Sequence, residues 1–105
     1  MVKSIGIKKL KTAIFISGNG SNMKNLIRFS KTKNSPIIVD FVLSSNKKAN
    51  GITHIKKNKI NFKIFNFKQR DNDEKKILDI LEKRKIQLIC LAGFMKILSK
   101  KFIKK

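Results

Sequence analysis

Short apolar runs alternate along this chain with segments whose apolar residues recur at helical spacing. Ala13–Ser17 is an apolar run that ends at a glycine, and it predicts a strand. In Ser21–Lys31, the residues Met23, Leu26 and Ile27 fall on one face of a helix. The first part of the chain is therefore predicted to form a strand, a glycine turn and a helix.

The same alternation continues through the middle of the chain. Ile37–Leu43 is a β-branched run with a single polar residue, which is typical of a parallel strand covered on both faces. Ile52 and Ile55 indicate a short helix, and the alternating segment Phe62–Phe67 predicts a third strand.

A third helix and a fourth strand follow. Asp71 and Glu74, three residues apart, resemble a capping box and predict the start of the helix. The buried stripe of this helix is expected to consist of Ile77, Leu78 and Leu81. Arg84-Lys85 ends it with charges that favour a helix C-terminus. Gln87–Leu91 is then a strongly apolar strand.

This order of strands and helices favours an α/β fold, an open, mostly parallel sheet with helices on both faces. No internal repeat or linker composition interrupts it, so a single domain is expected. Ligands of such sheets bind beyond the carboxyl ends of the strands, near the switch in strand order. Three loops are expected at that edge: Gly18–Ser21, Ser44–Asn50 and Ala92–Lys96.

The charge of the chain is strongly positive. Its 105 residues include 26 Lys and Arg against 6 Asp and Glu, a formal net charge of +20. Such an excess can favour nucleic-acid or anionic-membrane binding. Only Arg28, Arg70 and Arg84 are arginines, however, and the lysines are scattered through nearly every segment. Because Ile, Lys and Asn share A- and T-rich codons, we interpret the charge as nucleotide bias rather than as evidence for a nucleic-acid partner.

The cysteine and histidine counts restrict metal and disulfide chemistry. Cys90 is the single cysteine and His54 the single histidine, so a disulfide framework or a Cys-based zinc cluster is excluded, and no metal site is predicted. Cys90 is expected to be a small core residue on a buried strand. Because the chain has a single cysteine, a reducing, cytoplasmic setting is expected. No membrane span is expected, since no segment approaches about 20 apolar residues.

The first loop, Ser17–Asn22, contains the most informative residues. Gly18 and Gly20 permit positive φ and close backbone approach. Ser21 and Asn22 open a helix, whose N-terminus offers N–H groups to an anion, most naturally a phosphate. A tight strand-to-helix turn explains the same glycines without any ligand. The loop also lacks the third glycine of the dinucleotide fingerprint and the Gly-Lys-Ser/Thr ending of a P-loop.

The segment after the fourth strand, Leu91–Ser99, places apolar residues near the expected ligand edge. These are Phe94, Met95, Ile97 and Leu98. Apolar walls at this edge suit a flat heteroaromatic ligand. A hydrophobic plug for the core explains the same residues.

Three motifs together resemble phosphoribosylglycinamide formyltransferase. They are the Ser-Gly-Asn-Gly-Ser-Asn loop, the Ser45-Asn46-Lys47 turn followed by Ala49 and Gly51, and the Leu-Ala-Gly-Phe-Met-Lys-Ile-Leu-Ser segment. The resemblance covers about Thr12 to Phe102, with the motifs in the family's order and spacing. It implies a Rossmann-like formyltransferase fold with four N-terminal strands present. Residues 12–105 would form the N-terminal part of the domain, and residues 1–11 a basic extension.

The resemblance also implies an activity and its ligands. The reaction is formyl transfer from 10-formyltetrahydrofolate, as cosubstrate, to glycinamide ribonucleotide in de novo purine biosynthesis, and no metal is implied. The substrate phosphate would be held by Gly20, Ser21 and Asn22. The folate would be held by Arg70, Met95, Lys96, Ile97 and Leu98, much of it through backbone groups. The family commonly has Arg where Lys96 stands.

The resemblance implies no catalytic residue within the chain. The family's catalysis depends on an Asn and a His of an Asn-x-His-Pro-Ser segment and on a later Asp, which fall beyond Lys105. We therefore expect the chain alone to bind weakly without turnover. Its fourth strand is expected to leave an unpaired apolar edge, which associates with the missing C-terminal half or with itself. A small basic nucleic-acid-binding protein and an inactive decayed or split-gene product remain open as alternatives.

Overall fold

A computed structural model describes residues 9–17, 21–46, 51–94, 96, 98, 99 and 102. In this part of the chain, strands and helices alternate from β1 to β4. The strands are β1 (Leu10–Ile16), β2 (Ile37–Ser44), β3 (Asn61–Ile64) and β4 (Leu88–Leu91). The helices are α1 (Ser21–Ser30), α2 (Gly51–Lys57) and α3 (Arg70–Lys83). The strands pair in the order β3-β2-β1-β4, all of them parallel, so the predicted fold class is confirmed.

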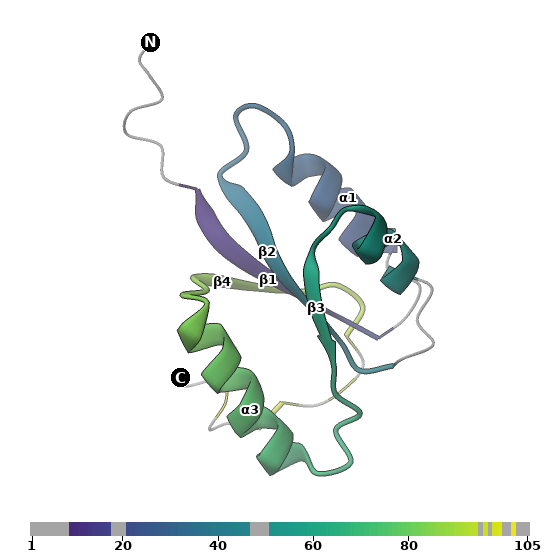
Figure 1. Cartoon of the computed structure of the whole chain (residues 1–105), viewed down its shortest axis with the longest axis vertical. Helices are drawn as coiled ribbons and strands as arrows, with labels where there is room; N and C mark the ends of the chain where they lie inside the picture. Colours follow the sequence, from purple (N-terminus) through teal and green to yellow (C-terminus); the bar gives the residue numbers. More distant parts are fainter. Residues whose placement is uncertain are drawn as a thin grey trace.

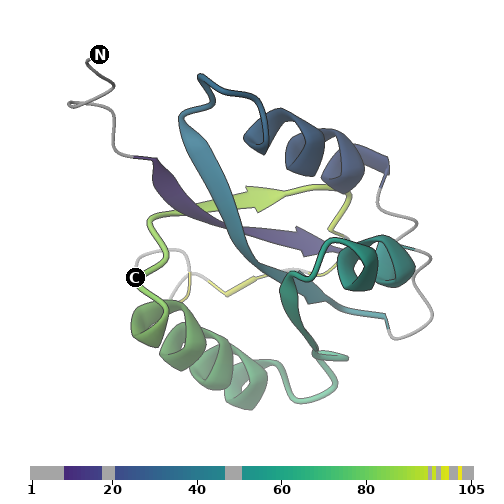
Figure 2. The same ribbon diagram turned by 45° about the horizontal axis from the view of Figure 1, so that its top comes forward.

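Helices cover both faces of the sheet, with α1 and α2 on one face and α3 on the other (Figure 1 and Figure 2). Because successive side chains of a strand point to opposite faces, the central strand β1 supplies both cores. The core beside α1 and α2 contains Ile14, Ile16, Met23, Ile27, Val42, Ile55 and Ala92. The core beside α3 contains Ala13, Phe15, Phe41, Leu43, Ile77, Leu81 and Phe102.

The strand order reverses at β1, which has β2 on one side and β4 on the other. Ile16 pairs with Ser44 of β2, and Phe15 pairs with Leu91 of β4, so the loops after these strands leave at the same edge. A switch of this kind is where open parallel sheets bind their ligands. The fold therefore brings the glycine loop and the segment after β4 together at one edge.

Two strands differ from their predicted bounds by three residues at one end, and the other two by a single residue. The first begins at Leu10 rather than Ala13, because the Leu10 N–H donates to the carbonyl of Pro36 at 2.8 Å and the pairing with β2 starts there. The strand thus includes the last two residues of the expected extension, residues 1–11. The third strand ends at Ile64 rather than Phe67. Phe67 has a φ of 61°, which is incompatible with a continuing strand.

The start of α3 also differs from its prediction. Gln69 is the N-cap residue and makes no side-chain cap bond, so the predicted capping box of Asp71 and Glu74 is wrong. The helix starts earlier because Gln69 already accepts a backbone bond from Asp73 at 2.9 Å. Arg70, which lies before the predicted helix start at Asp71, is consequently the first helical residue.

The strand β4 is an exposed edge in the part of the chain that the structure describes. Its pairing partner is β1, and Leu91 is 58% exposed. Most of β4 is exposed, so the expectation of a buried strand is wrong, but Cys90 itself is half-buried and packs against the core beside α1 and α2. A groove of about 630 Å³ runs between α3 and β4, and its lining is mostly apolar. Among the helices described, none is both long enough and apolar enough to cross a membrane.

Candidate functional site

Hydrogen bonds tie together the loops at the carboxyl edge of the sheet. The Ser45 N–H donates to the carbonyl of Ile16 at 3.0 Å, and the Ala92 N–H donates to the carbonyl of Phe15 at 2.9 Å. The hydroxyl oxygens of Ser17 and Ser45 lie 2.5 Å apart. The loops after β1, β2 and β4 therefore start side by side from a rigid base.

The helix α1 opens at this edge with Ser21 and Asn22, both exposed. Its first turn contains no acidic residue, so the positive end of the helix dipole is not neutralised there. An N-terminus of this kind, with a hydroxyl and an amide beside it, can bind an anion such as a phosphate. Ser21 and Asn22 thus lie where the sequence predicts them, while Gly20 is outside the described residues.

The segment after β4 turns at Gly93, whose φ of 73° lies in the left-handed region that glycine favours. Phe94 then packs edge-on against Phe15, with ring centroids 5.4 Å apart, and against Phe67, at 5.5 Å. Leu98 is half-buried against the same core. For Phe94 and Leu98, the interpretation as a hydrophobic plug therefore fits better than an open apolar wall.

The other residues predicted in this segment fall into two groups. Lys96 lies among the residues that the structure describes and is exposed, so its side chain is accessible at the ligand edge. Met95 and Ile97 lie outside the described residues.

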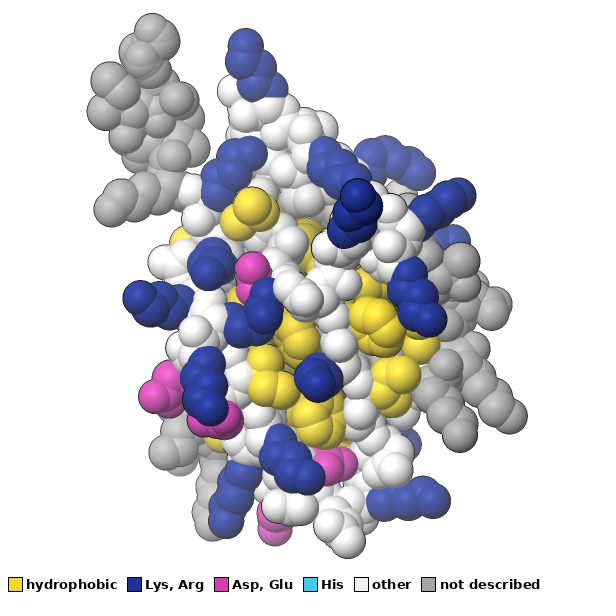
Figure 3. Space-filling view, viewed as in Figure 1, with side chains coloured by type: hydrophobic (Ala, Val, Ile, Leu, Met, Phe, Trp, Pro, Cys, Tyr) yellow, Lys and Arg dark blue, Asp and Glu magenta, His cyan; other side chains and the backbone are white. Residues whose placement is uncertain are grey.

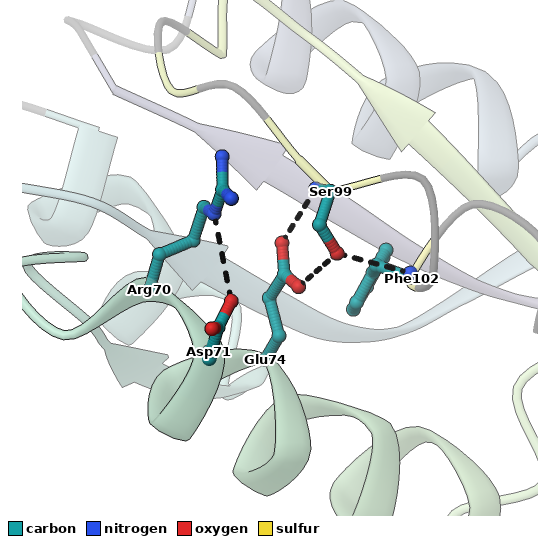
Figure 4. Close-up of polar contacts among 5 residues, drawn as sticks. All are labelled: Arg70, Asp71, Glu74, Ser99 and Phe102. Carbon is teal, nitrogen blue, oxygen red and sulfur yellow. Dashed lines mark hydrogen bonds and ion pairs between the residues drawn. The ribbon is translucent and has the colours of Figure 1, made fainter.

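Arg70 stands at the start of α3, the helix that follows the loop after β3. Its Nε lies 3.8 Å from Oδ1 of Asp71, and both side chains are exposed, so this ion pair restrains Arg70 only weakly. Figure 4 shows that Arg70 and Glu74 point from α3 to the same side, as expected for residues four apart on a helix.

Glu74 is the residue of this region whose role sequence reasoning missed. Its carboxylate accepts the N–H of Ser99 at 2.7 Å and the Ser99 hydroxyl at 2.5 Å. Its spacing could have drawn attention to it, because Glu74 precedes Ile77, Leu78 and Leu81 by three, four and seven residues and so shares their buried face. An acidic side chain on a buried face requires a partner.

The described side chains of this edge are suited to binding. Ser21 and Asn22 carry an exposed hydroxyl and an exposed amide, and Arg70 carries an exposed cation, whereas the hydroxyls of Ser17 and Ser45 bond to each other. Among the residues that the structure describes, no group of three or more His, Cys, Asp or Glu side chains could hold a metal ion. The edge can therefore receive an anionic ligand through hydrogen bonds and positive charge.

Comparison with known proteins gives consistent matches over nearly the whole chain. Residues 10–105 match the family described as Formyl transferase. Over 101 residues the chain is 36% identical to the trifunctional purine biosynthetic protein adenosine-3 of Homo sapiens, which corresponds to 93% of this chain and 10% of the human protein. Over 95 residues it is 34% identical to phosphoribosylglycinamide formyltransferase of Haemophilus influenzae, covering 88% of this chain and 45% of that protein.

Solved structures give the same result. The structure of phosphoribosylglycinamide formyltransferase from Brucella melitensis matches with a TM-score of 0.86 and 36% identity, covering 91% of this chain and 52% of that one. The enzyme of the same name from Campylobacter jejuni matches with a TM-score of 0.84 and 31% identity, covering 94% and 55%. The chain thus spans about half the length of these bacterial proteins.

Proposed function

Since this chain belongs to the formyl transferase family, we propose that it forms the substrate-binding part of a phosphoribosylglycinamide formyltransferase. The reaction transfers the formyl group of 10-formyltetrahydrofolate to the amino group of glycinamide ribonucleotide, a step of de novo purine biosynthesis. The observation that carries the proposal is the switch point of the sheet. There the N-terminus of α1 and the segment after β4 follow two adjacent strands, β1 and β4.

The phosphate of glycinamide ribonucleotide binds at Gly20, Ser21 and Asn22 in this proposal. Support comes from the opening of α1, where Ser21 and Asn22 are exposed and the first turn has no acidic residue to compete for the helix dipole. An anionic substrate is also attracted by the net charge of +20.

The folate binds across Arg70, Met95, Lys96, Ile97 and Leu98. Arg70 is exposed at the start of α3 and points to the side on which Ser99 lies (Figure 4). Because Leu98 packs against the core, this residue contributes its backbone rather than an open side chain. Lys96 is exposed and supplies a positive charge for a carboxylate of the folate.

The chemistry requires groups that the proposal assigns to a C-terminal part of the domain. No catalytic residue is assigned to this chain, and residues 12–105 are taken as the N-terminal part of the domain, after the extension 1–11. The exposed β4 edge and the apolar groove beside it are the surface on which the C-terminal part would pack. The proposed setting is cytoplasmic.

The test of the nucleotide site is a calorimetric titration with glycinamide ribonucleotide. Removing the amide in Asn22→Ala is expected to weaken binding about tenfold, the value of one lost hydrogen bond to a charged group. Asn25→Ala is the matched control, because Asn25 is exposed on the same helix, one turn further along. Equal affinities of the two variants would contradict the phosphate assignment.

The nucleic-acid alternative predicts different behaviour in the same experiment. Figure 3 shows Lys and Arg side chains spread over the whole visible face, with apolar side chains exposed between them, rather than gathered into a single stripe. Binding of RNA or DNA would fall steeply with salt and would not respond to Asn22→Ala. Saturable binding of glycinamide ribonucleotide that depends on Asn22 would reject this alternative.

A further inference from the structure

Glu74 is a buried carboxylate on α3 that is bound to a distant part of the chain. Glu74 is only 5% exposed. One carboxylate oxygen accepts the backbone N–H of Ser99 at 2.7 Å, and the other accepts the Ser99 hydroxyl at 2.5 Å. Burying a carboxylate costs free energy unless hydrogen bonds of this kind compensate for the lost hydration. The contact therefore fixes the backbone nitrogen and the hydroxyl oxygen of Ser99 firmly.

The contact extends from Ser99 into the core beside α3. The Ser99 oxygen, which donates its proton to Glu74, accepts the N–H of Phe102 at 3.2 Å. Phe102 is 6% exposed, and its ring centroid lies 6.2 Å from that of Phe15 on the central strand. Figure 4 shows this row from Glu74 through Ser99 to Phe102. A single carboxylate thereby anchors the end of the segment that begins at Gly93.

The neighbouring residue Asp73 has a similar role on the other side of the helix start. Its carboxylate accepts the N–H of Phe67 at 3.0 Å, which fixes the loop after β3 in its left-handed turn. Two consecutive acidic residues therefore hold the two loops that border the start of α3. Arg70 lies one helical turn before Glu74, on the same side (Figure 4).

We propose that Glu74 is a positioning residue for the folate site: by holding Ser99, it determines where the backbone at Lys96 and Leu98 stands relative to Arg70. This inference rests on the proposed function, since the folate assignment of these residues is part of it. Glu74 itself does not contact the ligand. It acts through Ser99, and its removal loosens one wall of the site without removing any binding group.

Hydrogen exchange tests the contact directly, at the amides of Ser99 and Phe102. Glu74→Gln removes the negative charge, and both amides are expected to exchange about tenfold faster or more, while those of β1 and β2 keep their rates. Ser99→Ala removes only the hydroxyl and should expose Phe102 in particular, whereas Ser99→Thr retains the hydroxyl and restores protection. Glu82→Gln, an exposed acid on the same helix, is the control. Unchanged exchange in Glu74→Gln and Ser99→Ala would overturn the proposal.

Ligand affinities separate positioning from a general loss of structure. The probe is a non-reactive deaza analogue of 10-formyltetrahydrofolate, and Glu74→Gln is expected to weaken its binding about tenfold. Ser99→Thr should bind the analogue more tightly than Ser99→Ala, because it retains the hydroxyl. The affinity for glycinamide ribonucleotide should change by less than about twofold, as for a surface substitution. Equal weakening for both ligands would overturn the positioning role. If the unmodified chain binds no folate analogue, the folate assignment fails and the positioning role fails with it. Faster exchange of the Ser99 and Phe102 amides in Glu74→Gln would then still identify the contact, without a role in folate binding.

Discussion

At the scale of single residues, two lysines occupy backbone positions that favour glycine. Lys59 and Lys85 both have a φ of 57° and follow the last turns of α2 and α3. After α3, the N–H of Ile86 donates to the carbonyl of Leu81 at 2.9 Å, the bond of a Schellman motif. The motif requires the left-handed conformation at Lys85, which costs a residue with a Cβ atom about 1–2 kcal/mol.

Replacing Lys85 with glycine is therefore expected to stabilise the protein. We expect Lys85→Gly to raise the free energy of unfolding by about 1 kcal/mol, because the strain is relieved at an exposed site. Lys76→Gly, in the exposed interior of the same helix, should lower it by about 1 kcal/mol. Urea unfolding of both variants gives the comparison, and a destabilised Lys85→Gly would show that the strain is absent.

Residue patterns in the sequence predicted local roles better than distant ones. Ser21 and Asn22 lie at the helix start where the glycine loop predicted them, since that assignment depends only on adjacent residues. The spacing of Glu74 from Asp71 fits a capping box, which is a purely local pattern. The actual partner of Glu74, Ser99, is 25 residues away, and no local pattern connects the two.

At the scale of elements, a bulge in β2 connects the sheet with the end of α3. Thr12 pairs with Val39 but Ala13 pairs with Phe41, so Asp40 is an extra residue without a partner on β1. Its carboxylate accepts the Nε–H of Arg84 at 2.7 Å, and both side chains are partly buried. The Arg84 guanidinium also lies 5.7 Å from the centroid of the Phe41 ring. Arg84, which the sequence indicated only as a favourable charge at the helix end, holds that end on β2.

A double-mutant cycle on Asp40 and Arg84 measures this connection. Because the pair is charged, short and partly buried, we expect a coupling energy of about 1–3 kcal/mol. The control cycle uses Asp79 and Lys83, an exposed pair one turn apart on α3 at 3.1 Å, for which about 0.3–0.5 kcal/mol is expected. Similar couplings in the two cycles would mean that α3 does not depend on the bulge.

The sequence predicted the order and type of the elements, but their ends depend on partners that it does not reveal. The alternation in Phe62–Phe67 is that of a strand, yet β3 ends at Ile64, which pairs with Ser44. The Phe65 N–H still donates to the Ser44 carbonyl at 2.9 Å, and β2 provides no further residue beyond that point. A strand can extend only as far as its neighbour, so periodicity alone overestimates its length.

At the scale of the whole molecule, the β4 edge of the sheet combines exposed apolar side chains with an apolar groove. β4 exposes Leu88, Ile89 and Leu91, and the groove between it and α3 is lined by further apolar residues. An edge strand with exposed apolar side chains and unpaired backbone groups favours pairing with another chain. The core of a chain of 105 residues leaves a small margin of stability, so covering this surface is expected to stabilise the fold.

The proposed function assigns this surface to the C-terminal part of a formyltransferase domain, and this assignment can be tested by measuring association. The chain alone is expected to self-associate in analytical sedimentation and to unfold with low cooperativity. Adding the complementary C-terminal half should give a one-to-one complex with a sharper unfolding transition. Leu91→Lys places a charge on the exposed edge and should reduce both kinds of association. Ile38→Lys, at a 49% exposed residue of β2, is the matched control and should reduce neither. A monomeric chain with a sharp unfolding transition would contradict the prediction, because the β4 edge would then be stable without any partner.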